Sequence, residues 1–380
     1  MSNSNLRHYI IPLIAFLSYA SVSTFADQKH ETLKQALELI DSKIDGNIEK
    51  GAKLLISLAE TDCIQAYPIL ADLYMQGMGV KKDSKEAAKL FRRSALTGNL
   101  ESQNNMGWLY ANGIGVEKDH QKAFEWYSKA STKGLRIAQH NLAECYRLGR
   151  GTKKDFIEAT DLYIKAANQN YIESQFVLGQ LYAKTQPIES FKWYRKAADN
   201  GHAMAQYETA NSFLSGTGVS ENPASALDYF TMAAKQDHAE STFVTGKLIY
   251  QGYGTDRNQQ KGISIIMKAS SLGSSAATKT LPTLSVRKFN LLDCLQNASE
   301  GNINSILDLG WNYFEGTNIG KNNVEAYAWF NLAAEFTGDK KHIWTRSFIA
   351  RQLDVNDLID AKKRASQISK LYSIKSPQHN

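Results

Sequence analysis

The chain has 380 residues, of which 43% are hydrophobic and 10% aromatic. This apolar content supports a folded core and argues against intrinsic disorder. The 6 prolines and 25 glycines are too few for a collagen-like or proline-rich protein. Lys and Arg number 44 against 38 Asp and Glu, a net charge of +6, and so weak an excess does not indicate a nucleic-acid-binding protein.

Residues 1–26 differ from the rest of the chain. Arg7 precedes an apolar run from Ile10 to Leu17, and small residues then lead to Ala26. This order is typical of a secretory signal peptide removed before Asp27. The run is too short and too interrupted for a membrane span; the alternative is an N-terminal anchor that stays attached. We therefore expect an exported protein.

Three cysteines, Cys63, Cys145 and Cys294, are widely spaced. An odd number without regular spacing does not form a disulfide framework, and no zinc-binding pattern is present. Cys145 stands at a core leucine position of the repeats described below and Cys294 at a core aromatic position. We expect both to be small buried hydrophobic residues.

Residues 66–335 contain a repeated pattern in which a Leu-Tyr pair is followed by a Gly-x-Gly loop. Its marker residue returns mostly every 36 residues, and such a period predicts a solenoid. The markers are Tyr74, Tyr110, Tyr146, Tyr182, Phe213, Ile249 and Tyr313. We predict seven to eight repeats, one shortened near 174–204 and one degenerate near 277–304. Residues 27–65 are expected to form a capping helix and a partial repeat, and residues 336–380 two closing helices and a tail.

Each repeat carries two helical patterns. In one repeat the first helix, helix A, runs from about Glu101 to Tyr110, and the second, helix B, carries an apolar stripe from Ala123 to Ala130. A capping residue precedes each helix B: Asp83, Asp119, Asp155, Asn222, Asn258 and Asn322. Residues suited to a left-handed conformation follow it: Gly98, Gly134, Asn170, Gly201, Asp237, Gly273 and Gly301. These signals agree on an all-α fold.

The stretch from Gly107 to Ala130 resembles the signature of Sel1-like repeats, which are relatives of tetratricopeptide repeats. The resemblance implies a right-handed α/α superhelical solenoid with a concave face lined by helix A. It also implies scaffold or adaptor work on a protein or peptide partner rather than catalysis. Exported relatives occur in bacteria that live inside host cells, where they act in host-cell interaction, and others assist quality control in the endoplasmic reticulum lumen. We expect a periplasmic or secreted bacterial protein, with the endoplasmic reticulum lumen as the alternative.

No residue set in the sequence predicts catalysis, a cofactor or a metal site. The Gly-x-Gly loops recur between two helices rather than after a strand, so we interpret them as tight turns and not as phosphate sites. No histidine pair has metal-binding spacing, and no nucleophile, base and oxyanion donors stand together. The alternative function is a secreted hydrolase of cell-wall material that uses the groove as its cleft.

The helix-A positions that the packing pattern leaves variable form the predicted partner-binding surface. They are Asp72, Trp108, His140, Glu144, Arg147, Gln180, Asn211, Lys247, Tyr250 and Trp311. Varied side chains on a constant scaffold suit selective binding, and large aromatic residues would be costly to expose without a purpose. The alternative is that they pack internally, which we favour for Trp311 and Phe314.

The segment from Gly338 to the C-terminus is basic, with nine Lys or Arg and four Asp or Glu. This cap is a candidate for weak contact with an anionic membrane or an acidic protein. The alternative is a solvated helical cap, and we expect no nucleic acid partner.

Overall fold

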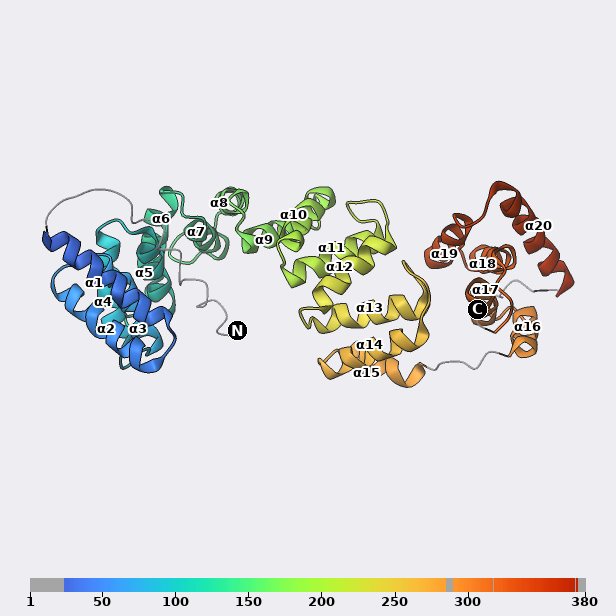
Figure 1. Ribbon diagram of the computed structural model, residues 1–380. Helices are drawn as coiled ribbons and strands as arrows, with labels where there is room; N and C mark the ends of the chain where they lie inside the picture. Colours follow the sequence, from blue (N-terminus) through green and yellow to red (C-terminus); the bar gives the residue numbers. More distant parts are fainter. Residues whose placement is uncertain (1–23, 285–289, 317, 373, 375–380) are drawn as a thin grey trace. The chain divides into compact units, whose positions relative to one another are not determined.

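A computed structural model describes residues 24–284, 290–316, 318–372 and 374. Within these residues the chain forms 20 α-helices and one short 3-10 helix, with no strand. Within the parts of the chain described, most helices pack side by side with the next helix in sequence (Figure 1). They fall into two compact units, a first unit that ends at Tyr171 and a second unit that begins at Ile172. The prediction of an all-α repeat fold is confirmed.

The first unit contains eight of the described helices. They are α1 (Thr24–Asp41), α2 (Asp45–Glu60), α3 (Ala66–Gln76), α4 (Ser84–Leu96), α5 (Leu100–Asn112), α6 (His120–Thr132), α7 (Arg136–Leu148) and α8 (Phe156–Asn168). Helices α3, α5 and α7 are the helices A of their repeats. The predicted signal peptide lies mostly outside the described residues, and cleavage before Asp27 would remove the first three residues of α1.

The second unit contains the remaining helices. They are α9 (Ile172–Tyr182), α10 (Pro187–Asp199), α11 (Ala203–Ser215), α12 (Pro223–Ala234), α13 (Ala239–Gln251), α14 (Gln259–Ser271), α15 (Ser275–Thr280), η3 (Leu281–Thr283), α16 (Leu291–Ser299), α17 (Ile303–Glu315), α18 (Asn323–Thr337), α19 (Lys340–Ala350) and α20 (Val355–Leu371). The predicted degenerate repeat corresponds to α15, η3 and α16, in which helix A is reduced to six residues. Helices α19 and α20 are the last two helices of the part of the chain that the structure describes.

The predicted helix boundaries are confirmed at both ends of helix B. In α6, for example, the Asp119 carboxylate accepts a hydrogen bond from the Lys122 N–H at 3.0 Å. The six expected capping residues each make such a bond: Asp83, Asp119, Asp155, Asn222, Asn258 and Asn322. After helix B the chain takes positive φ at Gly98, Gly134, Asn170, Gly201, Asp237, Gly273 and Gly301. Side-chain caps and left-handed residues thus satisfy the backbone groups that a helix leaves unpaired.

The Gly-x-Gly loops do more than the tight turn expected of them. The first glycine ends helix A with a positive φ, as Gly113 does at 71°. The second glycine, Gly115, lies so close to the preceding repeat that a Cβ would come within 1.9 Å of the Ser84 carbonyl oxygen. The same approach to a first-turn carbonyl recurs at Gly79, Gly151, Gly218 and Gly254. Each such loop therefore joins its repeat to the one before it.

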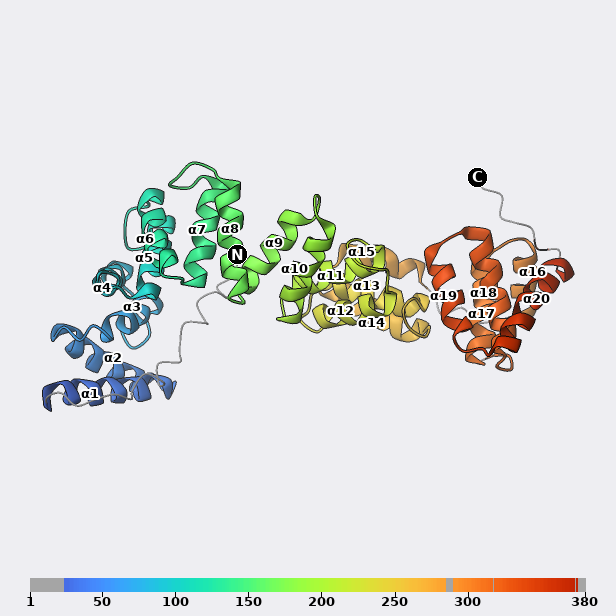
Figure 2. The same cartoon turned by 90° about the horizontal axis from the view of Figure 1, so that it is seen from above.

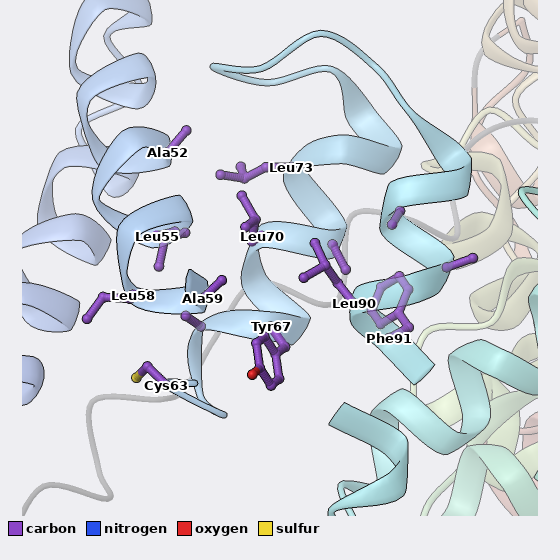
Figure 3. Packing of buried hydrophobic residues seen from close by; sticks show 14 of the residues in the cluster. Ala52, Leu55, Leu58, Ala59, Cys63, Tyr67, Leu70, Leu73, Leu90 and Phe91 are labelled. Carbon is purple, nitrogen blue, oxygen red and sulfur yellow. The ribbon is translucent and has the colours of Figure 1, made fainter. Parts of the chain in front are cut away.

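The core of the first unit lies between successive helices. Figure 3 shows part of it, where Leu55 of α2, Leu70 of α3 and Phe91 of α4 point into a common interior. Cys63 and Cys145 are buried, as expected for Cys145, whereas Cys294 in the second unit is only half-buried. The small residues of helix A let the helices approach closely. A Cβ on Gly107 of α5 would lie 2.6 Å from the Tyr127 ring of α6.

In the part of the chain that the structure describes, no helix is both long enough and apolar enough to cross a membrane.

Candidate functional site

The predicted binding residues of the first unit lie on helices α3, α5 and α7. Helices α5 and α7 meet directly, because the Asn141 side chain of α7 donates a hydrogen bond to Asn104 Oδ1 of α5 at 2.8 Å. One turn after Asn104 lies Trp108. Its neighbour Gly107 faces helix B, so Trp108 itself turns away from it, and 38% of the Trp108 residue surface is exposed. The structure thus places a large aromatic side chain at the surface of a close-packed repeat.

Glu144 and Arg147 form a fixed ion pair on α7. Arg147 Nη2 donates to Glu144 Oε2 at 2.7 Å and Arg147 Nε donates to Oε1 at 3.1 Å. The hydroxyl of Tyr163 on α8 also donates to Glu144 Oε1. Burial alone would raise the pKa of Glu144, but the hydrogen bonds from Arg147 and Tyr163 outweigh it and lower that pKa. The carboxylate is therefore ionised at neutral pH and held in one orientation.

His140 lies one turn before Glu144 and joins the same group. Its ring centroid is 5.4 Å from that of Tyr163 and 5.0 Å from that of Tyr171. The structure thus brings together three of the predicted residues, His140, Glu144 and Arg147. The sequence placed Tyr163 in the packing stripe and missed its contact with Glu144. The signal for it was the hydroxyl itself, since the equivalent residues in two later stripes are Phe230 and Phe330.

Asp72 on α3 is half-buried, and its carboxylate makes no hydrogen bond or ion pair with any residue that the structure describes. Burial raises the pKa of Asp72 to about 7. At neutral pH this carboxyl group is therefore partly protonated, and a partner that supplied a cation or a hydrogen-bond donor would ionise it.

The predicted residues of the second unit differ in accessibility. Gln180 of α9 and Lys247 of α13 are exposed, while Asn211 of α11 and Tyr250 of α13 are half-buried. They form a second set on the helices A of that unit.

Trp311 must be removed from the predicted surface, because it is buried. Only 2% of it is exposed, and its ring lies 5.0 Å from that of Phe330 and 5.9 Å from that of Phe314. The guanidinium of Arg257 lies 5.5 Å from the ring centroid, and a Cβ on Gly252 would collide with the ring. A residue enclosed in this way has no surface left to offer a partner.

We next consider whether the described side chains could form a cysteine nucleophile or a metal site. Burial raises the pKa of the Cys145 thiol to about 11, so this cysteine is not an activated nucleophile. In the described parts of both units, no three His, Cys, Asp or Glu side chains stand close enough together to hold a metal ion.

Comparison with known families gives one match, which covers most of the chain. The family model of the Sel1 repeat matches residues 69–99, 100–135, 136–171, 172–202, 203–238, 239–274 and 303–335. It includes the shortened repeat and passes over residues 275–302. No curated protein matches the chain.

Several solved bacterial structures are similar to the chain. A protective antigen of uropathogenic Escherichia coli with an SLR fold is 23% identical, and the alignment covers 94% of this chain and 89% of that one at a TM-score of 0.46. A Sel1 repeat protein of Oxalobacter formigenes is 25% identical over 70% of this chain and 96% of its own, with a TM-score of 0.48. An immunity protein of Pseudomonas aeruginosa is 18% identical over 60% of this chain and 89% of its own, with a TM-score of 0.35.

Proposed function

Because the chain belongs to the Sel1 repeat family, we propose that it is a non-enzymatic scaffold that binds a segment of a partner protein on the helix-A face of its first unit. Sel1 repeats are in general scaffolds for protein–protein interaction. The helix-A face is defined here by Asp72, Trp108, His140, Glu144 and Arg147. In the second unit, Gln180, Asn211, Lys247 and Tyr250 form a further surface of the same kind.

The observation that carries the proposal is the exposure of Trp108 beside two buried apolar residues of the same helix. Met106 and Leu109 of α5 are each 1% exposed, against 38% for Trp108. Tryptophan is enriched among the residues that dominate binding energy, since it buries a large area with few rotatable bonds. The nearby Glu144–Arg147 pair offers a fixed carboxylate and further guanidinium N–H donors to a partner.

The proposal includes export. The basic start, apolar run and small residues of 1–26 support a signal peptide, and a periplasmic or secreted location in a bacterium, with a role toward host cells, follows from the family resemblance. Mass spectrometry of the mature protein should find a new N-terminus near Asp27. An intact Met1 would contradict export.

Binding is tested by placing a photo-crosslinking amino acid at Trp108 and, separately, at Ile157. Ile157 on α8 belongs to the same unit and is 79% exposed, so it controls for nonspecific capture by an apolar surface residue. A specific partner should crosslink at position 108 and not at position 157. The unmodified protein should compete for it, whereas the Trp108→Ala variant should not. Equal capture at both positions would contradict the proposal.

A further inference from the structure

A cleft in the C-terminal cap is lined by residues other than those of the helix-A face. Helix α18 packs against both α19 and α20 (Figure 2), and these three helices line a cleft of about 550 Å³ that is open to solvent. Tyr327, Asn331 and Glu335 line it from α18, which places them one turn apart on one side of that helix. Arg346 of α19 and Lys362 of α20 line it from the other helices.

The two cations of this cleft have no carboxylate partner. Within residues 24–284, 290–316, 318–372 and 374, neither Arg346 nor Lys362 forms an ion pair, whereas the nearby Arg364 pairs with Glu325. Arg346 Nη1 makes one long contact of 3.4 Å with Asn331 Oδ1, which leaves the remaining guanidinium N–H groups to other acceptors. Unpaired Arg at the wall of a cleft is suited to bind a carboxylate.

The other wall residues restrict what kind of anion fits. The Tyr327 ring is buried, and its hydroxyl donates no hydrogen bond to a described residue. The pKa of Tyr327 is raised, mainly by burial, and the positive charge of Arg346 opposes this rise while the negative charge of Glu335 adds to it. Glu335 accepts a hydrogen bond from the Asn331 amide at 2.8 Å and adds a negative charge beside the cations. Leu358 supplies an apolar patch.

We propose that this cleft binds a carboxylate-bearing segment of a protein, with the carboxylate on Arg346 and Lys362, the Tyr327 hydroxyl as a further donor, and Glu335 accepting from the segment's backbone N–H. A mixed wall of two cations, one carboxylate and an apolar residue complements a peptide better than a membrane. Anionic lipid headgroups are bound by flat clusters of exposed basic residues, whereas Arg346 is half-buried and shares the wall with a carboxylate and an apolar residue. The site shares no residue with the helix-A face and does not depend on the function proposed for it.

The probe for this site is a fluorescein-labelled hexaglutamate peptide with an amidated C-terminus, followed by fluorescence anisotropy on the full chain. Binding should weaken by about tenfold in Arg346→Gln, as expected for loss of one charge-assisted pair, and by a smaller factor in Tyr327→Phe. The matched control is Lys363→Gln. Lys363 is adjacent to Lys362 on α20, its side chain is 70% exposed and it lies outside the cleft, so its removal changes the net charge equally. Trp108→Ala should bind the peptide normally.

A second, neutral peptide with a free C-terminal carboxylate is used as a competitor. If it displaces the probe, the cleft also accepts a terminal carboxylate; if only unlabelled hexaglutamate displaces the probe, the cleft accepts side-chain carboxylates. Either result supports the cleft. Unchanged melting temperatures establish that the variants fold. If Lys363→Gln weakens binding as much as Arg346→Gln, the peptide binds a diffuse basic surface and the proposal is wrong. It is equally wrong if Arg346→Gln and Tyr327→Phe both bind normally. The proposal is also wrong if the native chain binds phosphatidylglycerol vesicles but not the peptide, and if Arg346→Gln abolishes the vesicle binding. That result would mean that the cap binds a membrane instead.

Discussion

Gly115 and the carbonyl oxygen of Ser84 approach so closely that no side chain fits between them. A Cβ on Gly115 would lie 1.9 Å from that oxygen, and Gly115 also has a φ of 70°. Gly115 belongs to the loop after α5, whereas Ser84 begins helix B of the preceding repeat. The glycine is therefore needed for contact between repeats as well as for the turn within one.

Gly115→Ala should destabilise the protein by more than about 2 kcal/mol, because it adds a backbone collision to an unfavourable positive φ. Gly134→Ala is the control. Gly134 has a φ of 90°, and a Cβ added there would have no neighbouring atom within 4 Å, so its substitution should cost only about 1 kcal/mol. Thermal unfolding monitored by circular dichroism measures both. Equal losses would mean that the loop moves aside and that the close approach is unimportant.

The sequence predicts structural features, such as helix caps, that depend on residues close together in the chain. It does not predict contacts between residues of different repeats. Asp119 could be identified as a cap because its hydrogen-bond partner, Lys122, is three residues away. Trp108 and Trp311 occupy the same position of their repeats, yet one is 38% exposed and the other 2%. The difference arises because Arg257 and Gly252 of an earlier repeat cover Trp311, and no single repeat encodes that contact. The cleft in the cap was missed because its three walls come from three helices.

Trp108→Ala should lower the melting temperature only slightly, since 38% of the Trp108 surface is exposed and less apolar contact is lost than at a core residue. Tyr127→Ala on α6 removes an aromatic residue that is 5% exposed and should cost about 3–5 kcal/mol of stability. Differential scanning calorimetry of the two variants compares them directly. A loss at Trp108 as large as at Tyr127 would show that Trp108 is a core residue, and the helix-A face would lose its central side chain.

The Tyr163 hydroxyl should contribute to stability through Glu144. Tyr163→Phe leaves the ring in the core but removes a hydrogen bond to a charged acceptor, which costs about 1.5–3 kcal/mol. Exchanging the charges, with Glu144→Arg and Arg147→Glu together, keeps a local ion pair worth only about 0.5 kcal/mol but moves the acceptor away from Tyr163. In that exchanged background Tyr163→Phe should have little further effect on urea unfolding. The same loss in both backgrounds would mean that the hydroxyl does not act through Glu144.

Asp72 should make the protein less stable as the pH rises. Its pKa is raised to about 7 in the folded chain, above its usual value, so the folded state binds the proton more tightly and this stabilising effect disappears as the pH increases through about 7. Asp72→Asn removes the ionisation, and its melting temperature should exceed that of the native chain at about pH 8 but not at about pH 4. A constant difference between the two proteins across this range would show that Asp72 does not titrate as its burial requires.

His202 and His238 should make the protein less stable as the pH falls, which is opposite to the effect of Asp72. Both histidines cap helices through an unprotonated ring nitrogen. His202 Nδ1 accepts from the Ala205 N–H at 3.0 Å, and His238 Nδ1 accepts from the Ser241 N–H at 3.2 Å. Burial lowers the pKa of both histidines, and nearby Glu173 and Glu240 only partly oppose it. Between the lowered pKa and the ordinary value the unfolded chain binds more protons, so stability is lost as the pH falls.

The test uses Asp72→Asn as the background, so that the opposite effect of Asp72 is removed. Melting temperatures are recorded between about pH 7.5 and pH 5, the range in which histidine titrates. Adding His202→Asn and His238→Asn keeps a side-chain oxygen able to cap each helix but removes the titrating ring. The double replacement should therefore match its parent near pH 7.5 and lose less stability toward pH 5. Identical pH profiles would show that these caps tolerate protonation, whereas a loss that is equal at every pH would show that asparagine fails to replace the cap.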